Sequence, residues 1–199
     1  VDRTIPMLPE VLSNHICSLR PHEESLCFSV IFEFDSNANI KKYRFAKTVI
    51  YSDHRFSYED AQQVIESRKG LYAMELEKMN KIASKLRKEK YENGAINFET
   101  TEFRFTLDKN GKPTAVIPKI RKDAHKMIEE YMLLANKYVA KQLYVDNNKM
   151  PIPYRVHEEP SPEKLADFAE TAKNFGYRID ISNYKQLATS INHMVSKVQ

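Results

Sequence analysis

Residues 26–51 read LCFSVIFEFDSNANIKKYRFAKTVIY, and they decide what kind of sheet the chain can form. Apolar and polar side chains alternate through the first nine residues, which is typical of a strand with one covered face. Short polar residues at 35–39 then favour a turn, and the alternation returns up to residue 51. We therefore predict an antiparallel pair whose covered face carries Leu26, Phe28, Val30, Phe32, Phe34, Tyr43, Phe45, Val49 and Tyr51.

A second hairpin is predicted further along the chain. Phe103, Phe105 and Leu107 alternate with polar residues, and the turn sequence Asp-Lys-Asn-Gly at 108–111 leads to a return strand at 114–118. The signal is local, since both the strand alternation and the turn residues lie within 16 positions of each other.

Helical periodicity occupies most of the remaining chain. It runs from Tyr58 to Tyr91 with Gly70 separating two stretches, and from Lys122 to Tyr144 in a helix apolar on most faces, which we expect to be largely buried. Ser161 followed by proline begins another helix with an expected buried face of Leu165, Phe168, Ala172 and Phe175. A last helix has its apolar stripe at Leu187, Ile191, Met194 and Val198. The expected fold is α/β (α+β), with a mixed, largely antiparallel sheet and packed helices, formed by residues 1–199 as a single unit.

Composition excludes several classes of protein. The chain has 199 residues, of which 42% are hydrophobic and 29% are charged, and this composition is typical of a folded globular protein. Its formal charge of +4 is compatible with RNA binding but does not by itself indicate it. No apolar run is long enough to span a bilayer and no secretory signal is present, so we expect a cytoplasmic protein without membrane association. Only four glycines occur, each with a local turn role, so a nucleotide cofactor is not expected. Cys17 and Cys27 have no zinc-ligand spacing and are expected to be reduced, partly buried thiols.

Three polar side chains follow one line on the long helix. His125, Glu129 and Asn136 lie at i, i+4 and i+11. The periodicity favours an ordinary solvated edge or internal hydrogen bonds. The alternative is a row that lines a channel, in which Glu129 accepts hydrogen bonds from sugar hydroxyls. Metal binding by His125 and Glu129 is the weakest interpretation because a third ligand is missing.

Phe98 is out of register with the second hairpin, because it occupies an even position whereas the apolar residues of that hairpin are odd. It either fills the core or offers a flat face to a nucleic-acid base, and the sequence slightly favours the core. Basic residues that could follow a phosphate backbone gather after the hairpin, although such a cluster is usually ordinary surface; they are Lys119, Arg121, Lys122 and Lys126. His157 fits a hydrogen-bonded histidine at a strand end better than a general base. No cluster of aspartates for two cations occurs, and no serine or cysteine nucleophile stands in a recognisable elbow, so we predict no catalytic and no metal-ligating residue in this chain.

Four stretches resemble a known family: IPMLPEVLSNHICSL (5–19), GAINFE (94–99), RKDAHKMIEEYMLLAN (121–136) and YRVHEEPSPEKL (154–165). Together, in this order and spacing, they are similar to the RNB catalytic domain of ribonuclease R and ribonuclease II. The resemblance implies processive, magnesium-dependent hydrolysis of single-stranded RNA from its 3′ end to nucleoside monophosphates. It also implies that Phe98 stacks on bases and that Glu129 contacts the terminal nucleotides.

The resemblance further implies that the family's catalytic aspartates precede Ile5 and that its serine-proline-arginine segment follows Gln199. We therefore expect the chain to be the central part of such an exoribonuclease, inactive alone, without bound Mg²⁺, and forming one wall of the RNA channel. Its expected RNA contacts are Phe98, Glu129, His125, Asn136, Arg121 and Lys122. The alternative is a non-catalytic module that binds single-stranded RNA or serves as a scaffold.

Overall fold

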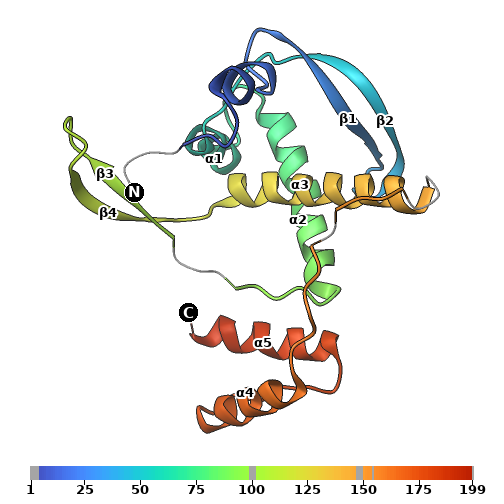
Figure 1. Cartoon of the computed structure of the whole chain (residues 1–199), viewed down its shortest axis with the longest axis vertical. Helices are drawn as coiled ribbons and strands as arrows, with labels where there is room; N and C mark the ends of the chain where they lie inside the picture. The colour runs from blue at the N-terminus through green and yellow to red at the C-terminus, as the bar shows by residue number, and fades with distance from the viewer. Residues whose placement is uncertain (1–4, 99–101, 147–149, 154, 199) are drawn as a thin grey trace. The chain divides into compact units, whose positions relative to one another are not determined.

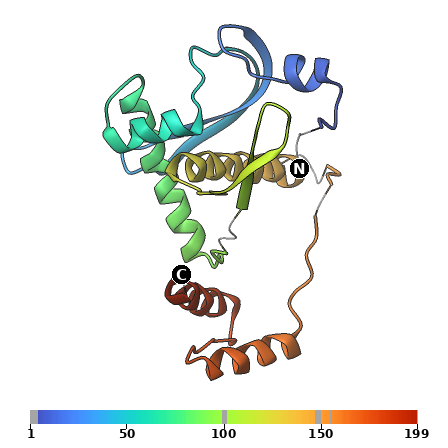
Figure 2. The same ribbon diagram turned by 90° about the vertical axis from the view of Figure 1, so that its left-hand side faces the viewer.

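The computed structural model describes residues 5–98, 102–146, 150–153 and 155–198. Two compact units can be distinguished along the chain. The first unit comprises Val1–Ala83 and Thr101–Val139, and the second comprises Ser84–Thr100 and Ala140–Gln199. Figure 1 and Figure 2 show the elements from two directions. Among the described residues, none of the helices has both the length and the apolar character needed to cross a bilayer.

The first unit begins with one short helical turn, η1 (Val11–Ile16), followed by the predicted antiparallel pair. Strand β1 (Glu24–Phe34) pairs with β2 (Ile40–Tyr51), with Phe32 opposite Tyr43. The turn forms because the Asp35 carboxylate accepts the backbone N–H groups of residues 37 and 39, at 2.9 and 2.8 Å. The antiparallel pairing predicted from the alternation is confirmed.

Burial of this hairpin differs from the prediction at one end. Leu26 and Phe28 are 86% and 82% exposed, although they lie on the predicted covered face. At the other end of the same face, Phe32 and Tyr43 contact the ring of Tyr138, with centroid distances of 5.0 and 4.6 Å. The alternation therefore identified the covered face of the hairpin, but the helix that carries Tyr138 covers only one end of that face.

Of the two thiols, Cys27 is half-buried as expected, whereas Cys17 is exposed.

Two helices follow, α1 (Tyr58–Ser67) and α2 (Ala73–Glu92). Gly70 separates them as predicted, with a φ of +116° that side-chain-bearing residues rarely adopt. The core of this unit consists of Leu76, Ala83 and Met127, with Phe56, Val64, Ile65 and Tyr131 packed around it.

The predicted second hairpin is also confirmed, with β3 (Glu102–Leu107) antiparallel to β4 (Pro113–Lys119). It leads to the long helix α3 (Asp123–Lys141), which continues as the turn η2 (Gln142–Asp146). The expectation that this helix is largely buried was wrong. Its buried residues are Ala124, Met127, Glu130 and Leu134, whereas Met132, for example, is 61% exposed. Within the described part of the chain, other elements pack against only one stripe of α3, and the apolar side chains on its other faces are exposed.

In the second unit, α4 (Pro162–Asn174) packs on α5 (Tyr184–Val198). Their shared core consists of Ala172, Ile179, Leu187 and Ile191. The predicted faces are partly wrong, because Phe168, Phe175 and Val198 are exposed. Helix α4 begins at the expected proline after Ser161, although the Ser161 side chain makes no capping hydrogen bond.

Apolar side chains remain exposed on β1, α3 and α4, for example Phe28, Met132 and Phe168. The two small cores, not broad burial, therefore hold the described elements.

Candidate nucleic-acid interface

The start of α3 gathers most of the predicted binding residues of the first unit. Arg121 and Lys122 precede the helix, and His125 and Glu129 lie on its first two turns. The Arg121 guanidinium donates to the Glu129 carboxylate, and both side chains remain partly exposed. A guanidinium has five N–H donors, so an arginine held by one carboxylate retains others for a phosphate. The pair thus offers a cation and an acceptor side by side.

An aromatic partner for His125 comes from α1. The rings of Tyr58 and His125 stack, with centroids 4.1 Å apart and planes within 10° of parallel. Tyr58 is the first residue of α1 because Ser57 caps that helix, accepting the Asp60 N–H at 3.0 Å. Tyr58 was not among the residues expected from the sequence. Ser57, followed three residues later by the acidic Asp60, marks the start of a helix and so places Tyr58 in its first turn. No neighbouring residue in the sequence, however, indicates that Tyr58 stacks on His125.

A buried glutamine joins the two helices that carry this stack. Gln62, only 6% exposed, accepts the Ala124 N–H at 2.9 Å and donates to Glu66 at 2.8 Å. The N–H groups in the first turn of a helix have no partner within that helix. Gln62 therefore caps α3 from α1, and it lies one helical turn after Tyr58 on α1.

A recess of about 200 Å³ adjoins the stacked rings. Most of its lining residues carry a polar or charged group, although their apolar atoms also face the recess; they are Tyr58, Glu59, Gln62, Gln63, Glu66, Ile120, Lys122 and His125. Sites for whole drug-sized ligands usually have volumes of roughly 300–1,000 Å³, so this recess suits a sugar or a base better than a complete cofactor.

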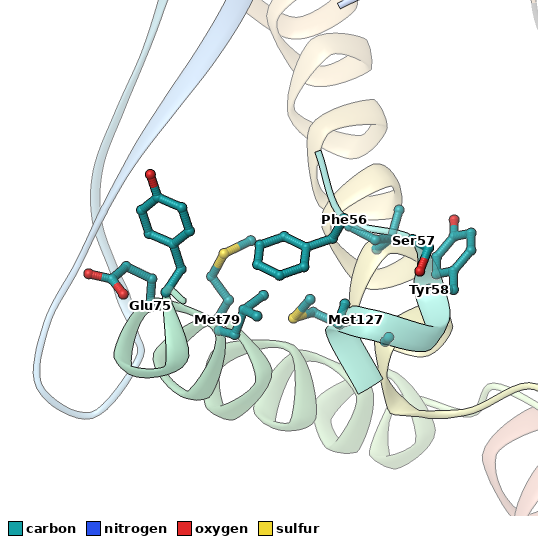
Figure 3. A pocket seen from close by; sticks show the side chains of 11 residues that line it. Phe56, Ser57, Tyr58, Glu75, Met79 and Met127 are labelled. Atoms are coloured by element: carbon teal, nitrogen blue, oxygen red, sulfur yellow. The ribbon is translucent and has the colours of Figure 1, made fainter. Parts of the chain in front are cut away.

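A larger cavity of about 540 Å³ lies between α1, α2 and α3 (Figure 3). Figure 3 shows Phe56, Met79 and Met127 converging in it, while the Tyr58 ring points away from them. The lining is mainly apolar: Phe56, Ser57, Tyr58, Ala61, Tyr72, Glu75, Leu76, Met79, Ala124, Met127 and Ile128.

The predicted basic cluster is partly neutralised by acids. Lys119 forms an ion pair with Glu102 at 3.0 Å, and Arg121 forms one with Glu129. The hydrogen bond and charge of Lys119 lower the pKa of the Glu102 carboxyl below its ordinary value. The cluster is therefore an alternation of charges rather than the uniform basic stripe that its sequence indicates.

The other predicted contacts are more dispersed. Asn136 is exposed two turns beyond Glu129, and His157 is exposed in an irregular segment. Phe98 belongs to the second unit and is 67% exposed, so within the described residues it does not fill a core. Glu99 of the GAINFE stretch and Tyr154 of the fourth stretch lie outside the described residues.

Magnesium is the ion that the resemblance implies, and the donors in the described part of the chain do not suit it. No group of three or more histidine, cysteine, aspartate or glutamate side chains converges there. Glu129 forms an ion pair with Arg121, and no third potential ligand converges on Glu129 and His125 within the described residues. Two-metal hydrolysis requires clustered carboxylates.

The geometry defines a mixed α/β protein in which two stacked rings and a charged pair lie together at the start of α3. A family model described as the RNB domain matches residues 1–199, and the chain belongs to the RNB-domain family. Ribonuclease R of Aquifex aeolicus is 36% identical over 184 residues, which are 89% of this chain and 26% of that protein. The predicted family and fold class are thus confirmed.

Solved structures agree. The apo form of Mycoplasma genitalium ribonuclease R has a TM-score of 0.82 at 28% identity, covering 94% of this chain and 30% of that one. The same protein is known in complex with ribose methylated single-stranded RNA. Yeast Ssd1, described as a pseudonuclease, shares the fold with a TM-score of 0.68 at 20% identity, over 94% of this chain and 23% of that one. This chain spans about a quarter to a third of the first two relatives' length, and the fold alone does not distinguish nuclease from pseudonuclease.

Proposed function

We propose that this chain forms one wall of the RNA channel in a processive 3′-to-5′ exoribonuclease that releases nucleoside monophosphates. The observation that carries the proposal is the stack of Tyr58 on His125 beside the Arg121–Glu129 pair, at the start of α3. The family match over the whole chain and the RNA complex of the Mycoplasma protein support it.

Each group has a role that follows from its chemistry. Arg121 and Lys122 attract phosphates, and the Glu129 carboxylate accepts a hydrogen bond from a sugar 2′-hydroxyl, the group that distinguishes RNA from DNA. His125 and Asn136 continue this polar line along α3. Phe98, in the other unit, provides an exposed ring on which a base stacks.

These residues bind and orient the strand, and they hold no metal in our proposal. Mg²⁺, where the parent enzyme uses it, supplies charge and an activated water to hydrolysis. The described residues lack a site for it. We therefore expect a protein of these 199 residues to release no nucleotides from single-stranded RNA with Mg²⁺ or Mn²⁺, and nucleotide release would overturn this part of the proposal. We also propose a cytoplasmic location, which cell fractionation would test.

A second candidate is a non-catalytic module that binds single-stranded RNA or serves as a scaffold. The described residues bring no metal-binding cluster together, which both candidates imply, so the donor set does not separate them. Hydrolysis by the full-length polypeptide distinguishes the candidates. Release of monophosphates from a 3′ end supports the exoribonuclease, and RNA binding without release supports the module.

The decisive test of the RNA-binding wall uses Glu129→Gln in the full-length polypeptide. This change should weaken binding of single-stranded RNA by roughly tenfold, the value of one hydrogen bond to a charged group, at about 1.5 kcal/mol. Binding of DNA with the same sequence should change much less, because DNA lacks the 2′-hydroxyl. Equal losses for RNA and DNA would contradict the assigned role. Glu163→Gln, an exposed acid at the start of α4, is the matched control.

Salt dependence tests the phosphate contacts separately. Log Kd for single-stranded RNA should vary with log salt with a slope of about 0.7 per neutralised phosphate, so Arg121→Gln and Lys122→Gln should each reduce that slope by about 0.7. Lys173→Gln on α4 serves as the control. Affinity independent of salt would refute a phosphate-following surface.

A further inference from the structure

The segment that carries Phe98 has no regular secondary structure. Helix α2 ends before Gly94, which has a φ of +96°, and residues 95–98 form neither helix nor strand. Backbone N–H and C=O groups in such a segment lack the partners that a helix or sheet provides. Whatever bonds them determines how firmly the next side chain, Phe98, is placed.

Asn192 on α5 supplies both partners with a single side chain. Its carboxamide oxygen accepts the Asn97 N–H at 2.7 Å, and its carboxamide nitrogen donates to the Ala95 carbonyl at 2.8 Å. Of the uncharged side chains, only asparagine and glutamine place a strong donor and an acceptor on neighbouring atoms in this way. Asn192 thus acts on this segment as a neighbouring strand would, although it is 95 residues away from Asn97 in sequence.

Both ends of this connection are themselves held. Asn192 follows Ile191, which is 5% exposed in the core between α4 and α5. The Asn97 side chain accepts a hydrogen bond from the Tyr91 hydroxyl of α2 at 3.0 Å. Asn97, the residue directly before Phe98, is therefore held from two helices, while the Phe98 ring is 67% exposed. An exposed ring on a fixed backbone loses little conformational freedom on binding, which favours affinity.

We propose that Asn192 is a positioning residue for RNA binding: by bonding the backbone of Ala95 and Asn97, it holds Phe98 ready to stack on a base. This inference rests on the proposed stacking role of Phe98. Asn192 itself touches no RNA in this scheme and acts only through the ring. Its loss therefore affects the same nucleotide that Phe98 contacts and no other.

The test uses the full-length polypeptide and single-stranded RNA with 2-aminopurine placed in turn at each of the last few nucleotides. Stacking on an aromatic ring quenches this base, so fluorescence at saturating protein reports the stacked geometry independently of affinity. Phe98→Ala should abolish quenching at one nucleotide and weaken binding roughly 5- to 150-fold. Asn192→Ala should reduce quenching at that same nucleotide and weaken binding roughly threefold to tenfold.

A second variant, Asn192→Asp, preserves the shape and the acceptor but loses the donor to the Ala95 carbonyl, and it should show the same partial defect. Asn174→Ala, at an exposed asparagine that ends α4, should leave quenching and affinity unchanged. In the Phe98→Ala background, Asn192→Ala should cost nothing further in binding, because two residues that act through one ring are not additive.

The outcomes separate the two proposals. If Phe98→Ala leaves quenching and affinity unchanged, the stacking role fails, and the inference about Asn192 fails with it. If Phe98→Ala has its effect but folded Asn192→Ala and Asn192→Asp proteins bind and quench normally, stacking stands and the positioning role is overturned. A full additional loss from Asn192→Ala in the Phe98→Ala background also overturns it, since Asn192 would then act elsewhere.

Discussion

Replacing Phe98 by alanine distinguishes a stacking platform from a core residue, and the structure sets the magnitudes. The ring is 67% exposed, so about a third of its surface is covered. Full burial of such a side chain contributes about 1.5–3 kcal/mol, and a third of that is about 0.5–1 kcal/mol of unfolding free energy. For a unit of this size, the melting temperature should fall by less than about 8 °C. Loss of base stacking should cost about 1–3 kcal/mol in RNA binding.

The assay measures thermal unfolding and RNA affinity on the same purified variant. Leu187→Ala is the comparison, because Leu187 is 6% exposed in the core of the same unit and its truncation should cost about 2–5 kcal/mol of stability. We expect Phe98→Ala to melt close to the parent and to bind RNA weakly, and Leu187→Ala to do the reverse. A loss of stability of about 3–5 kcal/mol in Phe98→Ala with unchanged RNA affinity would refute the stacking role and restore the core interpretation.

Three further changes test the geometry of the first unit. Gln62→Ala removes the oxygen that accepts the Ala124 N–H in the first turn of α3, and it should lower the unfolding free energy by about 1–3 kcal/mol. Gln63→Ala, at an exposed position, should leave the unfolding free energy unchanged. Equal melting curves for the two variants would exclude the capping role of Gln62. Lys119→Met should raise the pKa of Glu102 toward its ordinary 4.5, measured by NMR titration. Because the pKa of Glu102 is lowered in the folded protein, the ion pair stabilises the fold above pH 4.5, and this stabilisation is lost as the pH falls through the lowered pKa of Glu102. An unchanged Glu102 titration in Lys119→Met would refute the pairing. Burial raises the pKa of Tyr131 to about 12. The contribution of the neutral Tyr131 side chain to folding stability is therefore fully present below pH 10, and it is lost as the pH rises through 12. Ultraviolet titration of the parent against Tyr131→Phe should show this late step, and a difference near pH 10 would contradict it.

The sequence by itself determined the elements that depend on close neighbours. Both hairpins followed from alternation and from turn residues such as Asp35, whose carboxylate bonds the backbone two and four residues onward. The separation of α1 from α2 at Gly70 and the line of polar residues on α3 were equally accessible. These features come from interactions between residues a few positions apart, which a single sequence displays directly. The four family stretches added the expected roles of Phe98 and Glu129.

Burial and the partners of the site were decided only by the tertiary structure. Leu26 and Phe32 lie on the same face of β1, yet only Phe32 is covered, because Tyr138 reaches that end of the strand. The stack of Tyr58 on His125 similarly joins residues far apart in the chain. The alternation of apolar and polar residues predicts which side chains share a face of a strand, but it does not predict which other element packs against that face. Such long-range pairs depend on how whole helices pack, and no local rule in one sequence specifies that packing.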